Sequence, residues 1–149
     1  MKIYLASSWK NPYFNLLMEL LKRDLPNDKI YNFRDSNSSF GFHQLKEWNG
    51  TLKSYQECRK NYVFEKALEN DFCALQNANL VILLLPSGRS SHLEIGYAIG
   101  KEKQTILFNP SIGYEFDLMH SLIPYHAWNL KDLFNFIWMS RVNYESIDN

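Results

Sequence analysis

Glu94 follows a short loop of small, polar and basic residues that connects an apolar run to a helical pattern. The first turn of a helix has free amides and a partial positive charge, so a carboxylate there is expected to stay ionised and could act as a nucleophile. The spacing Ser91-x-x-Glu94 also fits a capping box, in which Glu94 binds the backbone amide of Ser91. Both roles are compatible because a carboxylate has two oxygens. The loop residues that could bind an anion are Gly88, Arg89, Ser90 and Ser91.

Asp71 is a second carboxylate in an unusual place, on the apolar side of an expected helix. The apolar stripe of that helix consists of Phe64, Ala67, Leu68, Phe72 and Leu75. Asp71 follows Phe64 by two helical turns, which places it only about 20° from Phe64 around the axis. A carboxylate among core residues must be paired or must line a cavity, and partial burial would make it a usable general acid. The alternative is a structural Asp paired with a nearby Arg or hydroxyl group.

Other polar residues lie where strands are expected to end. Arg34 and Arg89 are each either surface residues or ligands of a phosphate group. The run Ser7-Ser8-Trp9 either presents hydroxyls and a stacking ring to a nucleobase, or forms a cap followed by a packing aromatic.

The histidines and cysteines predict no metal site. None of the four histidines has a ligand-like spacing to another, and the sequence contains no CxxC. Cys58 and Cys73 lie too far apart along one expected helix to form a disulfide. Reduced thiols are expected, which favours a cytoplasmic location.

The alternation of apolar segments predicts an α/β fold. Strands are expected at Lys2–Ala6, 29–33, 79–85, Gln104–Phe108 and 125–128, and helices at 12–23, 54–77, 91–100 and 132–141. This order predicts a five-stranded parallel sheet of flavodoxin-like or Rossmann-like type with helices on both faces. Ligands bind such sheets beyond the carboxyl ends of the strands, where the segments beginning at Ser7, Arg34, Pro86 and Asn109 are expected to meet. The irregular stretch 34–50 is a candidate lid.

Length and charge narrow the class of protein. A chain of 149 residues predicts a single domain, residues 1–149. Lys plus Arg and Asp plus Glu number 16 each, which argues against binding to nucleic acid or to an anionic membrane. The longest apolar run is far shorter than the roughly 20 residues of a membrane span, and the N-terminal segment turns polar too early for a signal peptide.

Four segments in this order resemble the nucleoside 2-deoxyribosyltransferase family, which includes related 2′-deoxynucleoside 5′-phosphate N-hydrolases. The segments are Tyr4-Leu5-Ala6-Ser7-Ser8-Trp9, Asn70-Asp71-Phe72, Leu93-Glu94-Ile95-Gly96-Tyr97-Ala98 and Asp117-Leu118-Met119. The Glu-x-Gly-Tyr-Ala element after a buried strand is the most specific of the four.

The resemblance implies a role for each matching residue. Glu94 would attack C1′ of the sugar, Asp71 would handle protons at the base, and Tyr4 would hydrogen-bond the nucleophile. Met119 would come from a neighbouring subunit and form a wall of the sugar pocket. The implied protein is a flavodoxin-like enzyme of nucleotide salvage that acts on a small nucleoside or nucleotide and a nucleobase, forms a homo-oligomer and needs no cofactor.

One position departs from the family pattern. Transferases of this family often have an Asp six residues before the nucleophile, where this sequence has Gly88, followed by Arg89-Ser90-Ser91. The loss of an anion and the gain of a cation suit a 5′-phosphate, which favours a nucleotide hydrolase as the alternative to a transferase. A non-catalytic nucleotide-binding module, in which Glu94 only caps its helix, and a purely structural domain are further alternatives.

Overall fold

The computed structural model describes residues 1–36, 50–111 and 117–145, and within these ranges the centre of the molecule is a five-stranded parallel sheet. The strands are β1 (Lys2–Ala6), β2 (Lys29–Tyr31), β3 (Leu80–Leu84), β4 (Gln104–Phe108) and β5 (Tyr125–Ala127). Their order, β2-β1-β3-β4-β5, is the flavodoxin-like order of a doubly wound sheet. The predicted fold class is confirmed, and all five predicted strands are present, with β2, β3 and β5 shorter than predicted.

Helices cover both faces of the sheet and create two apolar clusters. On one face, α1 (Phe14–Asp24) and α6 (Leu130–Glu145) pack against Ile3 and Leu5 of β1. On the other face, α4 (Tyr62–Asn77) and α5 (Arg89–Gly100) pack against Tyr4 and Ala6. Successive side chains of a strand point to opposite faces, so the sequence of β1 alternates between the two clusters.

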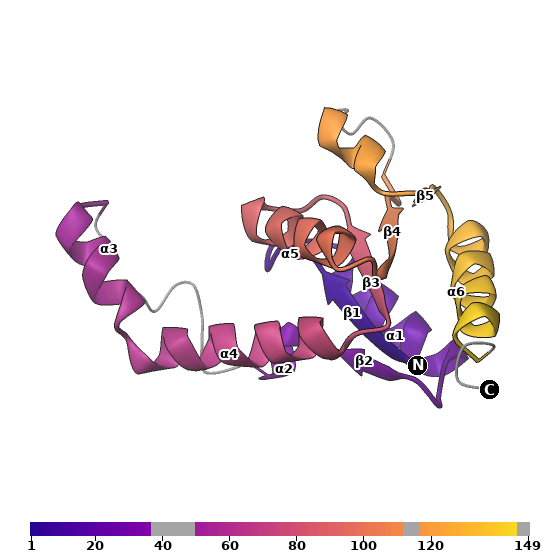
Figure 1. The fold of residues 1–149 in the computed structure, drawn as a ribbon, viewed down its shortest axis with the longest axis horizontal. Helices are drawn as coiled ribbons and strands as arrows, with labels where there is room; N and C mark the ends of the chain where they lie inside the picture. Colours follow the sequence, from indigo (N-terminus) through magenta and orange to yellow (C-terminus); the bar gives the residue numbers. More distant parts are fainter. Residues whose placement is uncertain (37–49, 112–116, 146–149) are drawn as a thin grey trace.

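The long helix predicted over residues 54–77 is two helices, which is a correction. α3 (Leu52–Arg59) ends at Lys60, and α4 starts afresh after Asn61, whose side-chain oxygen accepts a hydrogen bond from the amide of Val63. An Asn in this extended conformation is a favourable N-cap, which explains why the chain turns there. α3 and the first half of α4 project from the sheet as an arm (Figure 1).

The apolar stripe predicted for α4 is also partly wrong. Ala67 and Leu75 are buried, but Leu68 and Phe72 are 60% and 41% exposed. The Phe72 ring contacts the edge of Tyr97 on α5, with ring centroids 5.1 Å apart. The buried face of α4 is therefore rotated towards Asp71, which is half-buried as predicted.

Two shorter helices complete the described chain, α2 (Phe33–Ser36) and the 3₁₀ helix η2 (Leu118–Leu122). Residues 37–49, most of the candidate lid, lie outside the described residues. None of the described helices combines the length and the apolar character needed to span a bilayer.

Candidate active site

Tyr4 and Glu94 meet where β1 lies beneath α5. Tyr4 is 1% exposed, and its phenol hydrogen-bonds the Glu94 carboxylate. The capping box does not form: α5 begins at Arg89, Gly88 is the N-cap without a side-chain cap, and Ser91 is already a buried helical residue. Glu94 thus lies in the second turn of α5, where its side chain points at the sheet instead of at its own helix end.

The Glu94 carboxyl group is poorly solvated, which changes its protonation. Burial, followed by the charge of Asp71, raises the pKa of Glu94 to about 8, although the hydrogen bond from Tyr4 opposes this shift. The expectation that the helix end keeps Glu94 ionised is therefore wrong for the free protein at neutral pH. Burial also raises the pKa of Tyr4, with the Glu94 charge as the next cause, so that Tyr4 remains a neutral donor.

Asp71 reaches the same site from α4, where Tyr31 hydrogen-bonds it. The Tyr31 hydroxyl donates to Oδ1 of Asp71 over 2.8 Å. Tyr31 and Tyr4 are register partners on neighbouring strands, and their rings stack with centroids 5.4 Å apart and an interplanar angle of 14°. The structure thus brings Glu94, Asp71 and Tyr4 together as predicted, and adds Tyr31.

The sequence analysis did not identify Tyr31, because the hydrophobic pattern of its strand is weak. The available signal was that Tyr31 lies in the strand expected at 29–33, whose carboxyl end was expected to meet the polar segments after β1 and β3. Its pairing with Tyr4 depends on strand register, which the sequence pattern does not fix at a three-residue edge strand.

The loop after β1 is hydrogen-bonded to the carboxyl end of β3. The Ser7 hydroxyl donates to the carbonyl of Leu84 over 3.3 Å, and Ser8 Oγ accepts from the amide of Lys10. Asn11, which the sequence analysis did not single out, is buried and donates to the carbonyls of Leu84 and Pro86 over 3.2 and 2.9 Å. These bonds fix the loop beside the start of α5.

Trp9 and Arg34 have packing roles on the α1 side of the sheet. The edge of the Trp9 ring meets Phe33 at a centroid distance of 5.1 Å. The Arg34 guanidinium lies 4.2 Å from the centre of the Phe14 ring and donates to the carbonyl oxygens of Ser8, Trp9 and Asn11. Within the described residues, Arg34 therefore braces the β1–α1 loop, and its part in substrate binding stays a prediction.

Arg89 and Met119 line a separate cavity of about 760 Å³ between α5 and η2. Gly96 also lines this cavity, and a residue two positions after Glu94 points about 160° away from it around the helix. Met119 is 61% exposed, and within one chain it lies across α5 from Glu94. This position agrees with the expectation that Met119 serves a neighbouring subunit, which stays a prediction.

His92 and His120 form a pair that the sequence spacing did not reveal. Their Nε2 atoms are 3.0 Å apart with the rings nearly parallel, at an interplanar angle of 14°. His92 Nδ1 lies 2.8 Å from the carbonyl oxygen of Gly88, which can only accept, so in neutral His92 the free Nε2 accepts from His120. Burial, and then His92, lower the pKa of His120. Among the described residues these two and Asp117 place metal-ligand atoms within 4.8 Å of one another, but the histidine spacing is that of a hydrogen bond, and we assign no metal.

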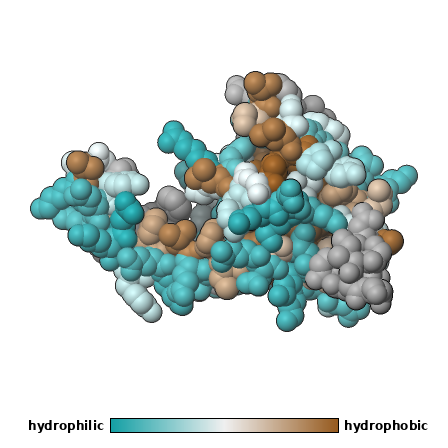
Figure 2. All heavy atoms as spheres, viewed as in Figure 1, coloured by the Kyte–Doolittle hydropathy of each residue, from teal (hydrophilic) through white to brown (hydrophobic). Residues whose placement is uncertain are grey.

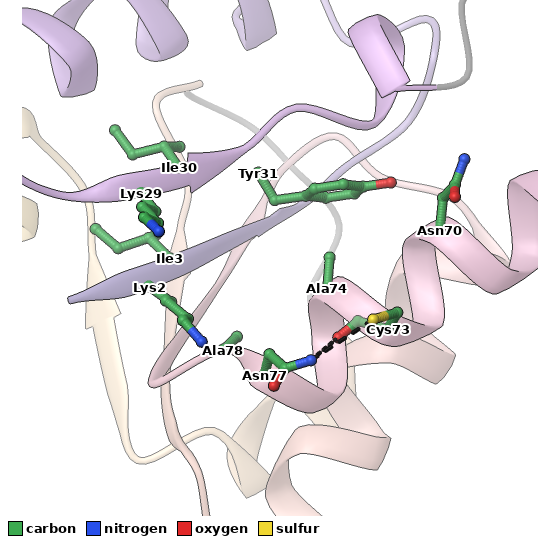
Figure 3. Close-up of a pocket in the computed structure, with 10 residues that line it drawn as sticks. All are labelled: Lys2, Ile3, Lys29, Ile30, Tyr31, Asn70, Cys73, Ala74, Asn77 and Ala78. Carbon is green, nitrogen blue, oxygen red and sulfur yellow. Dashed lines mark hydrogen bonds between the residues drawn. The ribbon is translucent and has the colours of Figure 1, made fainter.

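A second cavity of about 760 Å³ adjoins the carboxylate site between α4 and the β1–β2 edge (Figure 3). Tyr31 forms one end of this cavity beside Asn70, and Lys2 and Lys29 lie at the other end. The described residues that line either cavity include neither Glu94 nor Asp71.

The fold and the site together define the class of protein: a flavodoxin-like domain in which two carboxylates, Glu94 and Asp71, contact the tyrosines of β1 and β2. No known protein-family model and no curated protein matches the sequence. Among solved structures, the chain has the fold of a 2-deoxyribosyltransferase from the bacterium Bacillus psychrosaccharolyticus, with a TM-score of 0.59 and 20% identity over 89% of this chain and 90% of that one. A CMP N-glycosidase from Clostridium botulinum aligns with a TM-score of 0.49 and 16% identity over 92% of this chain and 98% of that one.

Proposed function

We propose that the protein cleaves the N-glycosidic bond of 2′-deoxynucleosides through a glycosyl-enzyme on Glu94 and transfers the deoxyribosyl group to another nucleobase. The observation that carries the proposal is the convergence of Glu94 and Asp71, from two different helices, on one pair of stacked tyrosines. The resemblance of the sequence motifs to nucleoside 2-deoxyribosyltransferases and the shared fold of one such enzyme support it.

The two carboxylates have complementary roles in this reaction. An ionised Glu94 oxygen attacks C1′ and forms an ester bond while the bond from C1′ to the base nitrogen breaks. The electron pair of that bond stays on the base, which receives a proton from Asp71. In the second half, a nitrogen of another base attacks C1′, Glu94 leaves as a carboxylate, and Asp71 takes up the proton that the new base loses.

The raised pKa of Glu94 determines which carboxyl group carries the catalytic proton before the reaction begins. In the free protein at neutral pH, Glu94 holds a proton beside the negative charge of Asp71. Transfer of that proton from Glu94 to Asp71 creates the nucleophile and the general acid in one step, without exchange with solvent. The reactive form is therefore the carboxylate pair that carries a single proton.

Product analysis tests the proposal most directly. The protein is incubated with each 2′-deoxynucleoside, with and without a second base, and free and exchanged bases are separated by chromatography. We expect base exchange by the wild type and a loss of about 10³-fold or more in Glu94→Ala. Exchange that survives in Glu94→Ala would overturn the assignment of the nucleophile.

A 2′-deoxynucleoside 5′-monophosphate N-hydrolase is the second candidate, and the start of α5 favours it. Gly88 leaves open space above the uncapped helix end, and Arg89 and Ser90 are exposed beside it. Monophosphates should then release free base, and Arg89→Ala should raise KM for the monophosphate about tenfold but not for the nucleoside. Lys101→Ala, at the opposite end of α5, is the matched control.

A nucleotide-binding module without catalysis is a further alternative. It predicts that nucleotides raise the melting temperature while no base is released or exchanged. The position of Glu94 argues against the simplest version of this alternative, because Glu94 does not cap its helix.

A further inference from the structure

Tyr31 links Asp71 of α4 to β2, the edge strand of the sheet. Its ring extends from β2 towards α4 (Figure 3), and its hydroxyl donates to one oxygen of Asp71 over 2.8 Å. The Tyr31 ring is stacked on the ring of Tyr4, whose phenol hydrogen-bonds the Glu94 carboxylate. Each phenol of the stacked pair therefore binds one of the two carboxylates.

The backbone fixes the spacing of these phenols. Tyr4 and Tyr31 are opposite each other in the β1–β2 register, and neighbouring strands lie about 4.8 Å apart. The rings are nearly parallel at 5.4 Å, so the two hydroxyls face their carboxylates side by side.

We propose that Tyr31 is a positioning residue for Asp71: its hydroxyl holds Oδ1 and orients the carboxyl group for proton transfer to the departing base. This inference rests on the proposed function for its kinetic consequence, but the placement of Asp71 is independent of that function. Tyr31 acts through Asp71, so it should matter only for bases that need a proton to leave.

The experiment compares Tyr31→Phe with the wild type on matched substrates. The Phe ring keeps the stacking on Tyr4 and removes only the hydroxyl. 2′-Deoxyguanosine needs a proton on its base to leave, whereas 7-methyl-2′-deoxyguanosine already carries a positive charge and leaves as a neutral base. For an enzyme that accepts only pyrimidines, 2′-deoxyuridine and its 5-fluoro analogue, a better leaving group, replace this pair. Tyr125→Phe, which changes an exposed tyrosine of β5, is the control.

We expect Tyr31→Phe to lower kcat for the base that needs protonation by about 10-fold to 100-fold, with less than about twofold change for the better leaving group. Asp71→Asn should show the same selectivity, and Tyr125→Phe should show neither effect. Equal losses on both substrates, or none, would overturn the role of Tyr31.

A crystal structure of Tyr31→Phe decides the placement without reference to activity. We expect the Asp71 side chain to leave its wild-type rotamer. An Asp71 carboxylate in its original place would refute the inference, even if the kinetics had changed. If the wild type turns over no deoxynucleoside or deoxynucleotide, the proposed function fails, and this structure still shows whether Tyr31 positions Asp71.

Discussion

Glu94 is half-buried against the sheet near a second carboxylate, so its ionised form is unfavourable in the folded protein. A surface Glu has no such penalty. Strongly shifted pKa values are enriched at functional sites, where charge is needed during a reaction and not at rest. The penalty can be measured without any substrate.

The stability of the protein should fall as Glu94 ionises. Its pKa is about 8 when folded and close to 4.5 when unfolded, so the folded state binds the proton more tightly and stability decreases as pH rises between these values. Glu94→Gln keeps an acceptor for Tyr4 but cannot ionise. We expect its free energy of unfolding to exceed that of the wild type by about 5 kcal/mol at pH 9 and by almost nothing at pH 4.

Urea unfolding at several pH values measures this difference. Glu65→Gln, at an exposed position of α4, is the matched control and should follow the wild type. Parallel curves for Glu94→Gln and the wild type would show that Glu94 is solvated.

The pH dependence of the reaction should differ between substrates. If the singly protonated pair is reactive, kcat/KM for a natural deoxynucleoside should decrease above pH 8, where Glu94 loses its proton and none is left for the base. For 7-methyl-2′-deoxyguanosine, which needs no acid, kcat/KM should instead rise with pH up to about 8. Rates from pH 6 to 9 test this contrast, and a common profile for both substrates would contradict the shared proton.

The residues of the site differ in how far the sequence predicts them. Glu94 and Asp71 were visible because their positions are unusual within local patterns, a helix start and an apolar stripe. The protonation of Glu94 was not predictable, because it depends on how closely β1 and α4 approach α5. Tyr31 was not predictable for a related reason: strand register brings it to Tyr4, across 27 residues of chain.

At the scale of elements, the division between α3 and α4 decides the shape of the arm. Apolar residues continue through residues 54–77 at helical spacing, so the pattern alone favours one helix. The side chain of Asn61 changes this outcome by capping the amide of Val63. The Asn side chain competes with the helical backbone for hydrogen bonds. A single such residue hardly changes the hydrophobic periodicity, but it separates the two helices.

Loss of this cap should loosen the arm. Asn61→Ala leaves the first amides of α4 without a side-chain acceptor and should lower the free energy of unfolding by about 1 kcal/mol. Asn61→Asp retains an acceptor and should remain close to the wild type. Thermal unfolding followed by circular dichroism compares the two, and equal melting temperatures would show that the cap contributes nothing.

At the scale of the whole molecule, the arm and η2 leave large apolar side chains uncovered. These are Leu52, Tyr62 and Leu68 on the arm, and Leu93, Leu118, Met119 and Leu122 around η2. Figure 2 shows apolar atoms on the arm and above α5 on the same side of the molecule. Extended apolar surface of this kind marks interaction sites, which supports the proposed homo-oligomer.

The five-stranded parallel sheet was predictable from the sequence, whereas these surfaces were not. A parallel sheet needs strands that are apolar on both faces and helices between them, and both signals are continuous in residues 79–108. Exposed apolar residues such as Leu68 and Phe72 carry the same signal as core residues. The periodic pattern cannot distinguish the two environments, so it placed them in the core.

Mixing two inactive variants tests whether neighbouring subunits share a site. Glu94→Ala lacks the nucleophile but keeps Met119, and Met119→Asp keeps Glu94 but should disrupt the sugar pocket of its neighbour. In a two-fold dimer with random reassociation, half of the dimers are mixed, and each mixed dimer has one intact site, so the mixture should recover about a quarter of wild-type activity. Leu122→Asp, a nearby exposed position, controls for damage to the η2 surface, and size-exclusion chromatography shows whether each variant still associates. If Met119 acts only within its own chain, mixing will restore nothing, and wild-type activity will follow the monomer peak; if Met119 has no role, Met119→Asp will be active on its own.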